Sequence, residues 1–361
     1  MAVQYHFTTT EEERARRRAD RSAARRQRRR LRRRAMLLRT LPPLLLVLLA
    51  AGGLLVLLAG NGGDAPLPEP PPMEHVPPAG EPAPAAAPPP AFSARTTPET
   101  AALGEEFSSG CAVLIDVESG TVLAEKNAFQ AVSPASMTKI LTLLVAVEAL
   151  EGLEGTASVT QAITDYCFEN QCSTAGFLAG EKVGLEDLLY GTILPSGADA
   201  ALALAEYVSG SEEAFVERMN EKAEELGLAA RFAGCVGLYH PETRCSVYDM
   251  AVILQAALEN PTCRKVLSAR TWLVPAAGER EALELSNWFI RRIEDHMPAG
   301  FEIQGAKTGF VTEAGNCAAS CAQGPDGRTY LCVTAQGAGI WPCIFDHVAL
   351  YQSVAGTGAE D

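Results

Sequence analysis

The sequence has few histidines and lacks the close cysteine pairs that are typical of zinc sites. Its 361 residues include only five histidines, and none of its ten cysteines form a Cys-x-x-Cys pair. Structural zinc sites are normally built from such pairs together with histidines. We therefore expect no metal ion, and no other cofactor is indicated. The chain also lacks a Gly-x-Ser-x-Gly string, which argues against a Ser-His-Asp hydrolase of that type.

Positive charge is scarce outside the N-terminus. Of the 30 Lys and Arg residues, 14 are arginines within residues 1–40, and none lies between residue 60 and Arg95. A basic run of this kind can indicate nucleic-acid binding. Beside an apolar segment, attraction to anionic lipid is the better explanation, so we expect no nucleic-acid partner.

Residues 41–60 contain no charged side chain. A helix of that length spans ~30 Å, the thickness of the bilayer core. The arginines before it predict a cytoplasmic tail at 1–40 and an extracytoplasmic remainder. We expect a single-pass transmembrane anchor in the cell membrane. A cleaved signal peptide is the alternative, because the segment also contains small residues.

The rest of the chain divides by composition. Proline and alanine dominate residues 61–106, which predicts a disordered linker between the anchor and the folded body. Residues 107–356 alternate apolar runs with turns and predict one folded domain, followed by a short tail at 357–361. The acidic residues are concentrated outside the N-terminal tail.

An extracytoplasmic location permits disulfides. The close spacings of Cys167 with Cys172 and of Cys235 with Cys245 make these two pairs candidate bridges. The other six cysteines cannot be paired from the sequence.

The apolar pattern of the body predicts strands at both ends and helices between them. A strand pair surrounds the turn at 118–120, and a second pair surrounds Pro325-Asp326-Gly327. Residues 136–151 have helical length with apolar residues nearly all round, which predicts a buried helix. Further helical patterns cover residues 185–189, 198–208, 212–226 and 341–354. This order predicts an α+β domain whose terminal segments share a sheet.

The first motif with chemical meaning is Ser136-x-x-Lys139, at the start of the buried helix. Positions i and i+3 lie on one helix face, so Lys139 reaches the Ser136 hydroxyl. A desolvated lysine has a lowered pKa and can take the proton of a serine nucleophile. An N-capping serine followed by a surface lysine is the simpler interpretation, but the apolar surroundings of Lys139 favour the chemical one.

Two further motifs follow in the chain. Ser196 lies in the string Pro195-Ser196-Gly197-Ala198, and Lys307-Thr308-Gly309-Phe310 lies in a strand-like segment. The lysine and threonine offer an ammonium and a hydroxyl, and the glycine lets a ligand approach the backbone closely. Such a strand can capture a C-terminal carboxylate.

In this order the three motifs resemble those of serine D-alanyl-D-alanine carboxypeptidases, the low-molecular-mass penicillin-binding proteins. Similar strings outside the motifs lie at residues 115–128, 219–228 and 246–251. The resemblance covers about residues 107–356. It implies a DD-peptidase/β-lactamase-like α+β fold, with an antiparallel sheet flanked by helices and a helical subdomain.

The resemblance also implies roles for the motif residues. Ser136 would attack the penultimate D-alanine of a peptidoglycan stem peptide ending in D-Ala-D-Ala, with Lys139 as base and Ser196 as proton relay. Lys307 and Thr308 would hold the terminal carboxylate. The N–H groups of Ser136 and Phe310 would bind the oxyanion, and Gly309 would belong to the same binding strand. β-Lactam antibiotics would acylate Ser136 as covalent inhibitors.

One position departs from the family. Ala198 stands where the second motif usually has an asparagine, and the adjacent Asp199 is not expected to replace it, because successive helical residues face different directions. Two alternatives to a carboxypeptidase remain: a catalytically weak homologue that binds peptidoglycan or organises wall synthesis, and, less well supported, a β-lactamase.

Overall fold

The computed structural model describes residues 92–278 and 280–355. The predicted tail (1–40), anchor (41–60) and most of the linker lie outside these residues, as does the C-terminal tail. Among the residues described, no helix is both long enough and apolar enough to cross a membrane.

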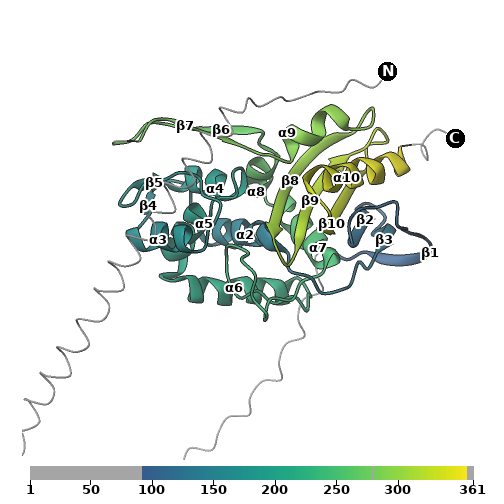
Figure 1. The fold of residues 1–361 in the computed structure, drawn as a ribbon, viewed down its shortest axis with the longest axis horizontal. Helices are drawn as coiled ribbons and strands as arrows, with labels where there is room; N and C mark the ends of the chain where they lie inside the picture. The colour runs from purple at the N-terminus through teal and green to yellow at the C-terminus, as the bar shows by residue number, and fades with distance from the viewer. Residues whose placement is uncertain (1–91, 279, 356–361) are drawn as a thin grey trace, which may run out of the picture. The chain divides into compact units, whose positions relative to one another are not determined.

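A six-stranded sheet forms the centre of the body, with the strand order β1-β3-β2-β10-β9-β8. Neighbouring strands are antiparallel except β1, which runs parallel to β3. The strands are β1 Arg95–Ala102, β2 Cys111–Asp116, β3 Thr121–Lys126, β8 Glu302–Val311, β9 Gly315–Gln323 and β10 Thr329–Gly337. The N- and C-terminal segments thus share one sheet, and β8 lies at its edge (Figure 1).

The folded body begins earlier than the composition predicts. Residues up to 106 were expected to be linker, but Arg95–Ala102 pairs with β3 as an edge strand. Thr100 Oγ1 donates a hydrogen bond to the carbonyl of Val122 at 2.6 Å, and Ala94 shares two hydrogen bonds with Tyr248. The prediction placed this boundary too late because β1 exposes most of its side chains and therefore lacks the apolar alternation of a strand.

Most of the helices lie between β3 and β8 along the chain, and one more, α10, follows β10. They are η1 Ala135–Thr138, α2 Lys139–Ala149, α3 Gln161–Glu169, α4 Leu185–Ile193, α5 Ala198–Ser209, α6 Glu212–Glu225, α7 Val247–Glu259, α8 Pro261–Ser268, α9 Ile290–Ile293, η2 Glu294–His296 and α10 Ile340–Val354. Two small antiparallel pairs accompany them: β4 Thr156–Ser158 with β5 Lys182–Gly184, and β6 Thr271–Val274 with β7 Leu283–Ser286.

The two faces of the sheet carry different cores. In β2, Val113 and Ile115 pack into the cluster that contains α2 and α7, whereas Ala112 and Leu114 pack into the cluster that contains the end of α10. Successive side chains of a strand point to opposite faces, so helices cover the sheet on both sides. The α+β prediction, with an antiparallel core sheet between helices, is confirmed.

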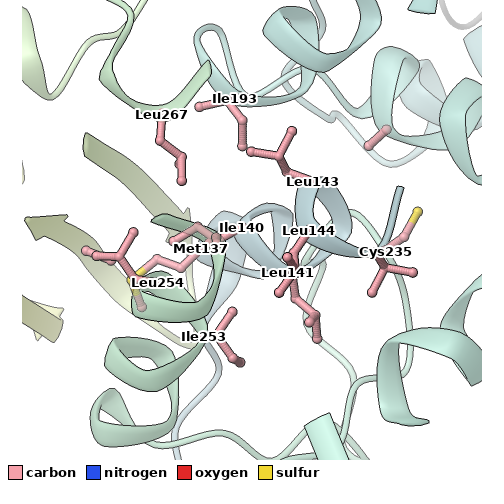
Figure 2. Packing of buried hydrophobic residues seen from close by; sticks show 14 of the residues in the cluster. Met137, Ile140, Leu141, Leu143, Leu144, Ile193, Cys235, Ile253, Leu254 and Leu267 are labelled. Atoms are coloured by element: carbon pink, nitrogen blue, oxygen red, sulfur yellow. The ribbon is translucent and has the colours of Figure 1, made fainter. Parts of the chain in front are cut away.

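Helix α2 is the centre of the larger core. Every residue from Lys139 to Ala146 is buried. Figure 2 shows its leucines and Ile140 surrounded by side chains from other elements, including Ile193, Leu267 and Leu254. Each fully buried aliphatic side chain contributes about 1.5–3 kcal/mol. The predicted buried helix is therefore confirmed, with the refinement that a 3₁₀ turn at Ala135–Thr138 precedes it.

The two candidate disulfides are not formed in the structure. All ten cysteines lie in the described residues and are present as thiols. Cys235 and Cys245 are both buried. The thiols of Cys167 and Cys172, in contrast, lie close enough for each to shift the pKa of the other.

Candidate active site

Ser136 lies in the 3₁₀ turn that leads into α2 and faces a cavity. The preceding residue, Ala135, has a left-handed backbone with φ of 48°. This conformation costs an L-residue about 1–2 kcal/mol. Strain of this size is typical of functional turns, where the surrounding packing holds one residue in a fixed orientation.

Strand β8 passes directly beside this turn because Gly309 has no side chain. A Cβ atom at Gly309 would lie 3.0 Å from the Ser136 backbone nitrogen and 3.0 Å from the Ala135 Cβ. Any other residue would push β8 away from the serine. Gly309 therefore allows the edge strand β8 to lie close to the backbone N–H of Ser136.

Lys139 is the buried partner of Ser136. Its Nζ lies 3.2 Å from Ser136 Oγ and donates a second hydrogen bond to the carbonyl of Val236 at 2.6 Å. The side chain is 2% exposed. Desolvation lowers the pKa of Lys139 to about 8, although nearby groups such as the Cys235 thiol oppose the shift. A substantial neutral fraction is therefore present near pH 8, and a neutral amine can accept the serine proton.

The second lysine of the site, Lys307, points from β8 to the second serine. Its Nζ lies 2.8 Å from Ser196 Oγ and 2.6 Å from the carbonyl oxygen of Thr308. Burial lowers the pKa of Lys307 well below its ordinary value, and the nearby charge of Lys139 acts in the same direction. Ser196 itself has a left-handed backbone with φ of 64°. The two serines thus each have a buried lysine within hydrogen-bonding distance.

Ala198 leaves the place of the usual asparagine without a polar group. Ala198 lines the cavity, and its backbone N–H donates to the carbonyl of Ser173 at 2.8 Å. The carboxylate of Asp199 accepts hydrogen bonds from the N–H groups of Ala175, Gly176 and Phe177. Asp199 therefore holds the neighbouring loop and does not replace the asparagine, which is what the sequence predicted.

A cavity of about 1090 Å³ joins these groups. Of the residues predicted from the motifs, Ser136, Lys139, Ser196, Thr308, Gly309 and Phe310 line it, while Lys307 lies buried beneath. The motifs do not include the other residues that line the cavity. These include Trp288, Arg292, Ile340 and the turn at 170–173.

Arg292 is a cation on the cavity wall that the motifs do not include. Its guanidinium lies 5.4 Å from the centre of the Trp288 ring, and Nη1 donates to the Trp288 carbonyl at 3.3 Å. The arginine ion pairs found in the described part of the chain are made by Arg270, Arg280 and Arg328, not by Arg292. Its charge is therefore available to a ligand.

A family model described as D-alanyl-D-alanine carboxypeptidase matches residues 95–335. The D-alanyl-D-alanine carboxypeptidase DacF of Bacillus subtilis is 34% identical over 236 residues, which is 64% of this chain and 58% of that protein. DacC of Escherichia coli is 37% identical over 177 residues, 47% of this chain and 43% of that protein.

Among solved structures, the Streptomyces K15 DD-transpeptidase superposes with a TM-score of 0.63 at 26% identity. The match covers 68% of this chain and 96% of that one. The curated relatives are matched over less of their length: the chain spans about half of DacF and DacC.

The lowered pKa of Lys139 predicts a pH dependence. Only neutral Lys139 accepts a proton, and its neutral fraction rises as the pH rises through about 8. We expect the acylation rate constant of Ser136 with a fluorescent penicillin to rise about tenfold per pH unit below this value and to level off above it. Stopped-flow measurement between pH 6 and 9 tests this, with Lys139→Arg as the control that stays slow. A flat profile in the wild type would show that Lys139 is not the base.

Proposed function

Because the chain belongs to the D-alanyl-D-alanine carboxypeptidase family, we propose that it removes the terminal D-alanine from peptidoglycan stem pentapeptides. The reaction proceeds through an acyl-enzyme on Ser136, which is also the point of β-lactam attack. The observation that carries this proposal is the buried Lys139 Nζ, 3.2 Å from Ser136 Oγ at a cavity bounded by β8.

In the first step, Lys139 takes the proton of Ser136 as Oγ attacks the carbonyl carbon of the penultimate D-alanine. The resulting oxyanion is bound by the backbone N–H groups of Ser136 and Phe310. One such donor typically contributes about 2.7–4 kcal/mol to the transition state. Gly309 supports this arrangement because it lets β8 approach the serine closely.

In the second step, the peptide bond breaks and its nitrogen takes a proton. Ser196 is the relay, since its hydroxyl faces the same cavity and hydrogen-bonds to Lys307 Nζ. D-alanine leaves with the former bond nitrogen as its amine. Water then attacks the ester on Ser136, and the tetrapeptide stem is released with a new carboxylate.

Recognition of the terminal carboxylate requires more than Lys307. Its Nζ is engaged by Ser196 and by the Thr308 carbonyl, and burial disfavours its charged form. Arginine keeps its charge at all relevant pH values and binds carboxylates with two parallel hydrogen bonds. We assign the charge of the carboxylate site to Arg292, on the cavity wall together with Thr308.

The proposed activity predicts release of D-alanine from a diacylated Lys-D-Ala-D-Ala peptide by the full-length protein in detergent. Ser136→Ala removes the nucleophile and is expected to reduce release by at least about a thousandfold. A coupled D-amino-acid oxidase assay measures the product.

The same assay distinguishes the alternative function. Absence of release, together with labelling of Ser136 by a fluorescent penicillin, would contradict the carboxypeptidase and favour a homologue that binds peptidoglycan. The replacement at Ala198 is the observation that keeps this second candidate open, because Lys139 lacks an amide partner from that position.

The carboxylate role predicts different effects for two neighbouring arginines. Arg292→Ala is expected to slow acylation of Ser136 by benzylpenicillin about ten- to a hundredfold, the loss of one strong charge-assisted interaction. Its effect on the methyl ester, which has no carboxylate charge, should be small. Arg291→Ala is the matched control: Arg291 also lies near Trp288, but it bonds Ser286 and does not line the cavity. Equal slowing of the acid and the ester would contradict the assignment.

For the location we propose a cell-membrane anchor at residues 41–60, with the catalytic body outside the cytoplasm. The support is the uncharged apolar segment after an arginine-rich tail. The full-length chain is expected to stay with the membrane during alkaline carbonate extraction, and a variant lacking 41–60 is expected to be released. Protease added to intact spheroplasts should remove the body and spare the tail. A mature protein that begins after residue 59 would instead demonstrate a cleaved signal peptide.

A further inference from the structure

Helix α3 ends in a Schellman motif. The N–H of Cys172 donates to the carbonyl of Cys167 at 2.9 Å, and the N–H of Gln171 donates to the carbonyl of Phe168 at 3.3 Å. Gln171 has a left-handed backbone with φ of 54°. Glycine is usual at this position, because it adopts that conformation without a steric penalty. The turn is therefore strained, and its geometry depends on the contacts around it.

This motif brings the side chains of its first and last residues together. The contact normally joins two apolar residues. Here both residues are cysteines, and each thiol shifts the pKa of the other, raising that of Cys167 and lowering that of Cys172. Cys167 is 3% exposed, whereas Cys172 is half-buried and lines the catalytic cavity. Cys172 is thus reachable from the cavity, whereas Cys167 is buried.

The turn between the two cysteines is part of the cavity wall. Asn170, Gln171, Cys172 and Ser173 all line the cavity. The carbonyl of Ser173 accepts a hydrogen bond from the N–H of Ala198, two residues after Ser196. This hydrogen bond connects the turn to the segment that carries the second serine.

We propose that Cys167 and Cys172 are an oxidation site whose disulfide fixes this wall of the cavity. The pairing does not depend on the proposed peptidase activity, since it follows from the helix end alone. It requires only a rearrangement of two side chains that the helix-ending turn already places next to each other.

The reaction takes two electrons from the two thiols and gives them to a donor disulfide. The thiolate of Cys172 attacks the donor and releases one donor thiol. Cys167 then attacks the Cys172 sulfur of the mixed disulfide and releases the second, so that one protein disulfide and two donor thiols result. Cys172 is the first nucleophile because it is accessible, and because the hydrogen bond from Cys167 lowers its pKa.

The other cysteines are poor competitors for this reaction. Burial raises the pKa of each of the other eight thiols: Cys111, Cys235, Cys245, Cys263, Cys317, Cys321, Cys332 and Cys343. A thiol held in its protonated form reacts slowly with disulfides. Oxidation is therefore expected to select the pair at the end of α3.

The test treats the reduced full-length protein with oxidised glutathione and maps disulfides in a non-reduced digest by mass spectrometry. We expect a linkage between Cys167 and Cys172 that dithiothreitol reverses. Cys321→Ala, a buried cysteine of β9, is the matched control and should leave this linkage intact. A glutathione adduct that persists on Cys172, or free thiols at both positions, would overturn the pairing.

Hydrogen exchange measures the effect on the wall. In the oxidised wild type and in oxidised Cys321→Ala, amide exchange across residues 170–177 is expected to be about tenfold slower than in the reduced proteins. Cys172→Ala should show no response to the oxidant. Formation of the disulfide without any change in exchange would overturn its role in fixing the wall, whether or not the protein releases D-alanine.

Discussion

The amine of Lys139 lies in a nearly dry environment beside the Ser136 hydroxyl, and much of the fold serves this arrangement. An isolated ammonium in such a place would be costly, because a buried charge is stable only when it is paired. Here the cost appears as a pKa lowered to about 8, so the amine is easily deprotonated. The buried helix α2 and the packing around it remove most of the lysine side chain from water. The hydrophobic core thus sets the basicity of the site.

Strained backbone conformations and close contacts between backbone segments occur beside the residues that carry the proposed acyl transfer. Ala135 and Ser196, beside or within the two serine motifs, both have left-handed backbones. At Gly237, a Cβ would lie 2.0 Å from the carbonyl oxygen of Ala135, so only glycine lets that chain pass and offer the neighbouring Val236 carbonyl to Lys139. These contacts orient the lysine without the asparagine that Ala198 replaces. They suggest why the site keeps a defined lysine position despite that substitution.

The sequence predicts the parts of this protein that depend on local pattern. The buried helix, the terminal strand pairs and the residues of the three motifs follow from apolar periodicity and short spacings, and the structure brings the motif residues together around one cavity. The sequence did not predict β1, because its exposed, polar side chains lack the alternation of apolar and polar residues that marks a strand. The sequence also did not identify Arg292 as a site residue, because the tertiary packing of α9 brings it to the cavity and no local sequence spacing indicates this. The spacing of Cys167 and Cys172 indicated proximity, but the helix-ending turn that causes it was visible only in the structure.

Direct titration of Lys139 tests the central claim, that burial makes this lysine a base for Ser136. Heteronuclear NMR of protein labelled at lysine Cε follows each side chain, and the resonance absent from Lys139→Met identifies the one required. The account predicts a midpoint near 8 for this resonance. A lysine that stays protonated up to about pH 10, as in water, would contradict it.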